Sequence, residues 1–427
     1  MPRESKNFIF LLQLCLLFPV FLQGQIRIAS PYSRYGVGDI NNNNNAWSSS
    51  MGDISIGMRS SGHILVGNPA SLTAIDSMSF VFEGGVLMNS VQLKSNLQQE
   101  NRNYASVGYL LFGFPVTRWW RTSLGLMPYS DVGYNVANIE NIKDIGPVSL
   151  LYTGEGGINR VNWGNGFRIL RNLSIGVNIS YLFGTMDRKS TALFVDSSYF
   201  AQMKLDNYLS LNDFYLTFGI QYHGTIKNDV RYTIGAMFGP ETKIRAKTDL
   251  IAQTFFLGSS GTEFPKDTLF TAQGYAGRIV IPATFGVGLS FEKQDKWVIG
   301  ADYKWQNWEN FNAFGISDSL VNSYQISVGG EILPNTNAYT NYFKRIRYRL
   351  GFYYSSTYLD LRGKHLNEYA VTLGFGLPLK ITRSQLNLGA QVGTRGTTDE
   401  GLIKETFFKF MIGFSINERW FVKHKYQ

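Results

Sequence analysis

The sequence has little cysteine, little charge and little proline. Its one cysteine, Cys15, lies within the first 24 residues, which we expect to be removed, so the remaining chain can form no disulfide, cysteine metal site or cysteine nucleophile. Charged residues make up 17% of the chain, whereas soluble proteins average about 25%. The 12 prolines among 427 residues are too few for a proline-rich disordered chain. A cytosolic enzyme, a disordered chain and a coiled coil all fit this composition poorly.

Motifs of catalysis and of nucleic-acid binding are also missing. The four histidines do not form the H-E-x-x-H spacing of zinc hydrolases, and no G-x-S-x-G motif occurs. Asp39 and Asp53 are the candidates for a loop Ca²⁺ site, although an ion-paired or solvated role is the simpler interpretation. The formal charge of +9 comes from scattered Lys and Arg residues rather than from one basic face. We therefore expect no enzyme, no cofactor, no metal and no nucleic-acid partner.

The first 24 residues have the pattern of a secretory signal peptide. Arg3 and Lys6 precede an apolar stretch, residues 8–22, and Gly24 supplies a small residue at the expected cleavage point. The stretch is shorter than the ~20 residues that a helix needs to cross a bilayer. Beyond it, no run of about 18 apolar residues occurs, so we expect an exported protein without a transmembrane helix.

The rest of the chain alternates between apolar residues and small polar ones. In residues 173–181 the odd positions are apolar or aromatic, and the even positions are Ser, Gly or Asn. A period of two is typical of a β-strand with two different faces. A soluble β-sandwich would show Lys and Glu on its polar face and would need only ~100 residues. Aromatic residues make up 15% of the chain, and together these features predict an all-β antiparallel transmembrane β-barrel.

Two kinds of segment depart from the strand pattern. Longer connections are expected around residues 185–211, 255–277 and 333–343, on the cell surface, because such barrels have short periplasmic turns and long outer loops. Residues 25–78 show little alternation and contain the asparagine run 41–45. The run is typical of a disordered leader, whereas the motifs on either side of it favour a plug that folds inside the lumen. The residue pattern leaves both interpretations open.

Motifs in residues 30–184 resemble the FadL family of outer-membrane transporters for long-chain fatty acids and other hydrophobic compounds. The segment begins with a glycine-rich stretch, continues with Met51-Gly52-Asp53-Ile54-Ser55-Ile56-Gly57, and reaches Asn68-Pro69-Ala70 just before the first strand. Further on, Ser123-Leu124-Gly125-Leu126-Met127-Pro128 is similar to an early family strand in which Gly is followed by Pro.

The resemblance implies about 14 strands in residues 79–427 and an N-terminal hatch in residues 25–78. It assigns to the hatch Gly52, Gly57, Asn68, Pro69 and Ala70. It assigns Gly125 and Pro128 to a strand kink that opens the wall sideways. Proline removes a ladder hydrogen bond and is confined to edges and bulges, so the alternative is that Pro128 ends its strand near the interface.

The implied function is passive uptake across the outer membrane of a Gram-negative bacterium. Hydrophobic small molecules such as long-chain fatty acids would bind in the lumen, the hatch would move, and the ligand would leave sideways into the membrane lipid. The alternative is a non-transporting partner barrel of a protein secretion or surface-assembly system. A ligand-like lumen favours the first, and a large apolar patch at the loops or the periplasmic rim favours the second.

Overall fold

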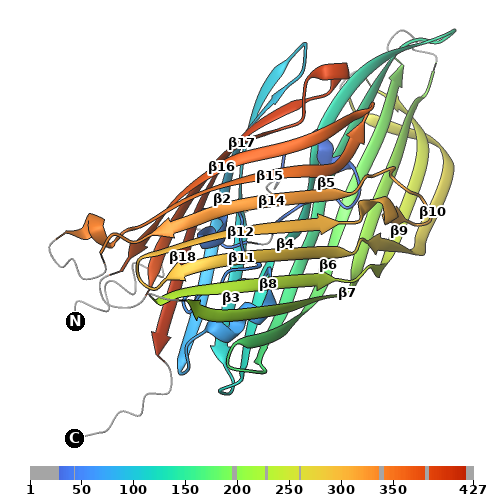
Figure 1. Ribbon diagram of the computed structural model, residues 1–427. Helices are drawn as coiled ribbons and strands as arrows, with labels where there is room; N and C mark the ends of the chain where they lie inside the picture. Colours follow the sequence, from blue (N-terminus) through green and yellow to red (C-terminus); the bar gives the residue numbers. More distant parts are fainter. Residues whose placement is uncertain are drawn as a thin grey trace, which may run out of the picture.

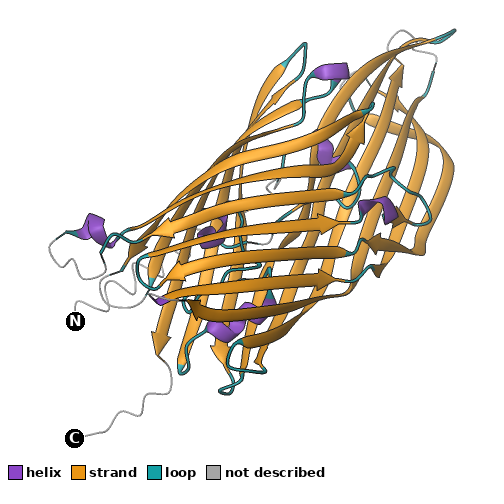
Figure 2. Cartoon of the chain, viewed as in Figure 1, coloured by secondary structure: helices purple, strands orange, loops and turns teal. Residues whose placement is uncertain are grey.

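The structure is a computed structural model that describes residues 28–42, 44–194, 200–226, 229–258, 261–335, 341–379 and 384–419. The expected signal peptide, residues 1–24, lies outside these ranges. Strands dominate the chain, as Figure 2 shows. Within the described ranges, no helix is both long and apolar enough to cross a membrane.

The strands form one antiparallel sheet that closes on itself (Figure 1). Closure is made by β2 and β18, which pair from Ser79↔Arg419 to Lys94↔Lys404. The wall strands are β2 (Ser79–Lys94), β3 (Gln99–Pro115), β4 (Trp120–Ile142), β5 (Gly146–Arg168), β6 (Leu173–Phe194), β7 (Gln202–Ile226), β8 (Val230–Gly239), β9 (Thr242–Leu257), β10 (Glu263–Ile281), β11 (Thr284–Lys293), β12 (Trp297–Gln306), β14 (Ser323–Ile332), β15 (Arg347–Leu361), β16 (Lys364–Pro378), β17 (Gln385–Arg395) and β18 (Lys404–Arg419).

Two of the wall strands are each interrupted once. Both β8 and β9 pair with β7, at Ile220↔Ala236 and at Leu211↔Ala246, so they are successive parts of one strand. In the same way, β10 and β11 follow each other across residues 282–283. Counted in this way, the wall is a closed barrel of fourteen antiparallel strands, which confirms the predicted fold class.

The two faces of β7 show why this sequence closes into a barrel. Phe214 and Tyr222 on its outer face are 56% and 46% exposed, whereas Tyr215 and Gln221 on its inner face are 5% and 0% exposed. Apolar side chains therefore face outward and polar ones inward, as in a membrane-spanning barrel. Closure also pairs the backbone groups that an open sheet would leave unsatisfied in lipid.

The expected long connections are wrong in extent. Residues 185–194 and 202–211 continue β6 and β7, and most of residues 255–277 belongs to β9 and β10. These strands extend past the apolar outer band, where both faces can be polar and the alternation that marks a strand is lost.

The connection after β14 is also on the opposite end from the one expected. We call the end of the barrel where β2 begins and β18 ends the lower end. The amide of Leu333 donates to the carbonyl of Lys296 in the β11–β12 turn, and the connection with η6 (Tyr342–Arg345) lies at the lower end (Figure 1). Loop length alone cannot assign the end at which a loop lies.

Residues 28–78, which we call the inner segment, lie inside the barrel (Figure 1). The segment contains η2 (Pro31–Arg34), β1 (Asp39–Ile40), α2 (Ala46–Ser49) and η3 (Pro69–Ala74). Its apolar side chains are buried, and Ala46, Met51 and Ile54 are each 0% exposed. The remaining short elements are η5 (Trp308–Asn310) and β13 (Asn312–Ala313), which follow β12, and η7 (Asp399–Gly401), which lies exposed between β17 and β18.

Candidate functional site

Wall glycines let the inner segment lie directly against the barrel backbone. A Cβ on Gly288 would lie 2.3 Å from the amide nitrogen of Gly57, and one on Gly176 would lie 2.4 Å from the carbonyl carbon of Pro69. Both distances are too short for any side chain. The same close approach to the segment occurs at Gly219, Gly235, Gly329, Gly351 and Gly374. The small inward residues of the strands therefore leave room for this segment.

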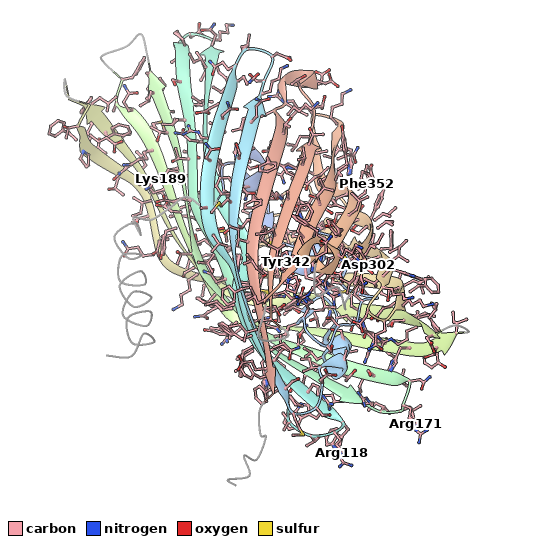
Figure 3. All side chains as sticks on the ribbon, turned by 90° about the vertical axis from the view of Figure 1, so that its left-hand side faces the viewer. Arg118, Arg171, Lys189, Asp302, Tyr342 and Phe352 are labelled. Carbon is pink, nitrogen blue, oxygen red and sulfur yellow. The ribbon has the colours of Figure 1, made fainter. Side chains whose placement is uncertain are left out.

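A buried carboxylate on the wall holds the middle of the inner segment. Asp302 on β12 accepts hydrogen bonds from the amides of Ser55 and Ile56 through Oδ2, at 2.5 and 2.7 Å. Its Oδ1 accepts from the amide of Gly57 at 3.2 Å. Figure 3 labels Asp302 within the barrel. Because hydrogen bonds to a charged group are the strong ones, this carboxylate fixes the backbone of the segment.

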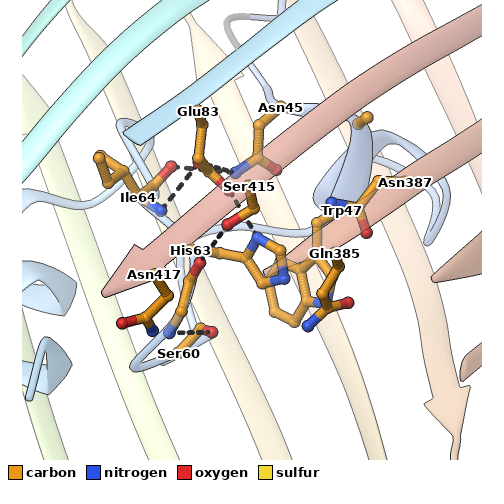
Figure 4. Close-up of polar contacts among 12 residues, drawn as sticks. Asn45, Trp47, Ser60, His63, Ile64, Glu83, Gln385, Asn387, Ser415 and Asn417 are labelled. Atoms are coloured by element: carbon orange, nitrogen blue, oxygen red, sulfur yellow. Dashed lines mark hydrogen bonds and ion pairs between the residues drawn. The ribbon is translucent and has the colours of Figure 1, made fainter. Parts of the chain in front are cut away.

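A second carboxylate, Glu83 on β2, holds the segment on the other side (Figure 4). Its Oε1 lies 2.6 Å from Nδ1 of His63, and its Oε2 accepts from Asn45 Nδ2 at 2.9 Å and from the amide of Ile64 at 3.1 Å. The ring of Trp47 stacks on His63 with centroids 5.0 Å apart. Asn45 belongs to the asparagine run, so this part of the run is bound to the wall rather than disordered.

The two aspartates considered for Ca²⁺ have protein partners instead. Asp39 Oδ1 lies 2.7 Å from Nη1 of Arg395, whose guanidinium also pairs with Glu405 at 2.6 Å. Asp53 Oδ1 accepts from Ser49 Oγ at 2.9 Å. The described residues contain no group of three or more His, Cys, Asp or Glu side chains that could hold a metal ion. Asp39 is therefore ion-paired, and Asp53 is held by hydrogen bonds from neutral side chains.

All five residues assigned to the hatch contact the wall. The amide of Gly52 donates to Thr372 Oγ1 at 2.8 Å, and Gly57 packs on β11 as described above. Asn68 caps η3 by accepting from the amide of Ala70 at 3.1 Å, and its Nδ2 donates to the carbonyl of Ile56 at 2.9 Å. Pro69 and Ala70 lie against Gly176 of β6. These residues position the inner segment in the lower half of the lumen.

Gly125 and Pro128, the two residues assigned to the strand kink, lie on β4 at the point where β3 and β4 stop pairing. We call this separation of the two strands the split. The ladder between these strands runs only from Pro115↔Arg121 to Leu110↔Leu126. Beyond it, β3 continues along β2 as far as Gln99, while β4 continues along β5. Gly125 lies at the end of the common ladder, and Pro128 lies beside a bulge just past it. Pro128 is thus inside β4, and the alternative that it ends the strand is wrong.

Where β3 no longer pairs with β4, strand β1 of the inner segment pairs with that edge of β4 instead. In β1, Asp39 pairs with Asp131 and Ile40 with Ser130. The amide of Asn41 donates to the carbonyl of Tyr129 at 3.0 Å. Just past the bulge, this edge of β4 is therefore paired with the two-residue strand β1, while its other edge stays paired with β5.

A cavity of about 210 Å³ lies directly behind this split. Tyr104, Ser106 and Gly108 of β3 and Met127 and Pro128 of β4 line it on the side of the split. On its other sides the lining mixes apolar and aromatic residues with charged and polar ones, among them Asn44, Asp53, Lys304, Glu368, Arg395 and Lys409. We call this cavity the chamber. It therefore offers both apolar surface and charge to a ligand.

A smaller cavity of about 80 Å³ continues the chamber toward β5 and shares Lys304 with it. Arg160 of β5 lines this part and is 4% exposed. Its Nη2 lies 2.8 Å from Met127 Sδ, and its Nε has no hydrogen-bond partner among the described residues. The described carboxylates form no ion pair with Arg160 or Lys304. Two cationic side chains thus face one cavity, which Asp53 and Asp302 also line without pairing to either of them.

Aromatic and aliphatic side chains form a buried cluster on the upper side of the chamber. Trp308 stacks on Tyr358 with centroids 4.5 Å apart, and both are buried in a cluster with Tyr32 and Tyr129. The cluster joins the inner segment, the wall and the connection after β12. The chamber therefore lies between this cluster and the lower half of the inner segment.

Sequence reasoning missed the charged residues that build this interior. Asp302 and Lys304 lie on the inner face of an alternating strand, where a charge is unusual. That position was the available signal, because a charge facing a lumen needs a partner or a ligand. Arg160 and Glu83 lie in less regular stretches, and only the three-dimensional structure brings them to the chamber and the inner segment.

The closed wall of fourteen antiparallel strands is a barrel with the fold of the FadL-type channels. Solved structures with this fold include the CymD monoaromatic hydrocarbon channel, with 12% identity, 92% of this chain and 100% of that chain covered, and a TM-score of 0.56. The Pseudomonas putida toluene transporter TodX has 16% identity, coverage of 89% and 99%, and a TM-score of 0.57. A Pseudomonas aeruginosa FadL homologue has 10% identity, coverage of 88% and 98%, and a TM-score of 0.57.

The chain belongs to the BamG family, whose model matches residues 5–427. No curated protein sequence matches it. At these identities the likeness to the solved channels shows the fold, and the function has to be argued from the interior.

Proposed function

We propose that this protein is an outer-membrane channel that takes up hydrophobic small molecules passively and releases them sideways into the membrane. The observation that carries the proposal is the split between β3 and β4 above Leu110↔Leu126, with a cavity directly behind it. The structures with the same fold include proteins named as a monoaromatic hydrocarbon channel and a toluene transporter, which supports a hydrophobic ligand.

Exit of the ligand sideways through the wall is favoured because the inner segment blocks exit through the lower end of the barrel. To leave through the lower end, a ligand would have to displace the backbone that Asp302 and Glu83 hold. To leave sideways, it passes between Ser106 and Met127, which both line the chamber at the split. Transfer of apolar surface to lipid, worth about 25 cal/mol per Å², then drives release without an energy source.

Movement of the hatch is part of the proposal and is limited to its upper portion. β1 pairs with β4 at two positions and Asp39 is ion-paired to Arg395, whereas the lower portion of the inner segment packs its backbone directly on wall glycines. Detaching β1 from the β4 edge would widen the split at Pro128. The lower portion, which includes Gly52, Gly57 and Asn68, would stay in place as a floor.

Long-chain fatty acids are the ligands that the charges of the chamber support best. The guanidinium of Arg160 and the ammonium of Lys304 line the same cavity, and the Asp53 and Asp302 carboxylates that also line it are ion-paired to neither. A ligand carboxylate between the two cations would pair with both and satisfy Nε of Arg160. The acyl chain would then extend past Met127 toward the split.

The experiment is to purify the protein from outer membranes in mild detergent, extract it, and identify co-purified molecules by mass spectrometry. We expect fatty acid in stoichiometric amount, and loss of most of it in the double variant Arg160→Met, Lys304→Met. The matched control is Lys243→Met on β9, an exposed site outside the chamber. A barrel that is empty, or that keeps its fatty acid in the double variant, would contradict the proposal.

The second candidate, a partner barrel in protein secretion or surface assembly, is favoured by one observation. Exposed apolar side chains alternate with arginines on two turns of the lower rim, where Trp119 is 54% and Leu170 is 62% exposed. A periplasmic rim of this composition is what a binding surface for another protein requires.

A further inference from the structure

A cluster of basic side chains faces the lower mouth of the barrel, apart from the chamber. Thr73 of η3 connects two of them: its Oγ1 accepts from Arg59 Nη2 at 2.9 Å, and its carbonyl accepts from Arg168 Nη2 at 2.9 Å. Arg59 also donates to Gln221 Oε1 of β7 at 2.9 Å. We call Arg59, Arg168, His223 and Arg231 the mouth cluster. They come from the inner segment, β5, β7 and β8, so the fold brings together residues that are far apart in sequence.

The mouth cluster has more positive charge than its neighbours balance. Arg231 Nη2 pairs with Glu292 Oε1 at 3.0 Å, whereas the described carboxylates make no ion pair with Arg59 or Arg168. Nδ1 of His223 is buried and has no hydrogen-bond partner among the described residues. Burial, together with the nearby charges of Arg168 and Arg231, lowers the pKa of Arg59 to about 10. A bound anion would relieve this repulsion.

Exposed apolar residues adjoin the mouth cluster on the lower rim. Arg168 is followed directly by Ile169 and Leu170, which are 55% and 62% exposed in the β5–β6 turn. On the neighbouring β3–β4 turn, Trp119 is 54% exposed and stacks on Phe167, with ring centroids 6.0 Å apart. Figure 3 shows Arg118 and Arg171 on these two turns at the lower tip of the barrel. Apolar and arginine side chains are thus mixed on one surface, a composition enriched at protein interfaces.

We infer that the lower mouth is a docking site for an acidic polypeptide segment of a periplasmic protein. Carboxylates of the segment bind Arg59, Arg168 and Arg231, and its apolar side chains cover Ile169 and Leu170. This site is separate from the ligand chamber and does not depend on the uptake function.

Two other occupants fit the observations less well. Lipid headgroups lie outside the wall, whereas Arg168 points inward to Thr73. A small anion such as phosphate would bind the guanidinium groups but would leave Ile169 and Leu170 exposed. An acidic segment with apolar residues satisfies both parts of the surface.

The probe is a fluorescein-labelled peptide of alternating glutamate and leucine, added to the full chain in nanodiscs of neutral lipid and followed by fluorescence anisotropy. We expect the double variant Arg168→Gln, Arg231→Gln to bind the peptide at least tenfold more weakly. The variant Leu170→Ser should weaken binding severalfold without any change in charge. The matched control is Lys243→Gln, Lys247→Gln on β9, which removes the same charge above the mouth.

Two further measurements distinguish an acidic segment with apolar residues from a purely acidic segment and from a small anion. A peptide of alternating glutamate and serine should bind more weakly than the leucine peptide, and inorganic phosphate at equal charge should not displace the leucine peptide. Equal binding of both peptides, displacement by phosphate alone, or equal loss in the β9 control would overturn the inference. Unchanged fatty-acid content in the mouth variants would show that any loss of peptide binding is not a loss of fold or of the chamber.

Discussion

The amide nitrogen of Gly57 in the inner segment lies so close to Gly288 of β11 that a Cβ on Gly288 would be 2.3 Å from it. Two backbone segments that are far apart in the sequence therefore touch inside the barrel. Asp302, on the neighbouring strand, accepts a hydrogen bond from the same amide. The contact shows that the inner segment and the wall fold as one packed unit in the lower half.

The substitution Gly288→Ala should loosen the inner segment. The added methyl group has no space against the backbone of Gly57, and overpacking of this kind costs about 1–3 kcal/mol. We expect a lower unfolding temperature and faster cleavage of the inner segment by a protease. The control is Gly62→Ala, whose Cβ would meet only Asn417 Nδ2 at 3.5 Å. Equal protease resistance of the two variants would show that the close packing is not real.

The substitution Asp302→Asn should also loosen the inner segment, because it weakens the hydrogen bonds that hold the segment to β12. The carboxylate accepts from three amides, and the side-chain amide of asparagine turns one acceptor into a donor that faces them. Hydrogen bonds to a charged group are worth roughly 1.5–3 kcal/mol, so a loss of that size is expected in chemical unfolding. Asp267→Asn, at an exposed carboxylate on β10, serves as the control. A loss no larger than in the control would contradict the role assigned to Asp302.

The substitution Arg160→Met should change the ligand preference of the chamber. Without the guanidinium, a long-chain fatty acid should bind about tenfold more weakly or worse, because it loses a charge-assisted hydrogen bond. The alcohol of the same chain length should bind as before, since it carries no charge. Displacement of a fluorescent fatty acid measures both. If acid and alcohol lost affinity equally, the variant would have damaged the cavity rather than removed a head-group contact.

The barrel could be predicted from the sequence because alternation records which face meets lipid. Phe214 and Tyr222 are large because they face outward, and Gln221 is polar because it faces the lumen. The strand extensions above the outer band were not predicted, because no solvent boundary imposes alternation there. The sequence does not decide whether residues 25–78 form a plug or a disordered leader. The inner segment is ordered by contacts with wall glycines that are distant in the sequence, and no local pattern shows such contacts.

The candidate site was only partly visible in the sequence. The motif resemblance pointed to Gly125 and Pro128, and the structure places both at the split between β3 and β4. It gave no reason to select Arg160, whose importance lies in what it lacks, a carboxylate within contact distance. Whether an arginine has an ion-pair partner depends on which strands the fold brings together, so the sequence of one strand does not predict it.

The central claim is that ligand leaves the chamber sideways between β3 and β4. Ser106 lines the chamber at the split, whereas its neighbour Val107 is 62% exposed on the outer face. Uptake of radiolabelled oleate by cells that carry Ser106→Trp or Val107→Trp therefore compares the same side chain inside and outside the split. The account predicts that Ser106→Trp abolishes most of the uptake while Val107→Trp, at equal amounts in the outer membrane, retains it. Full uptake by Ser106→Trp would contradict lateral release.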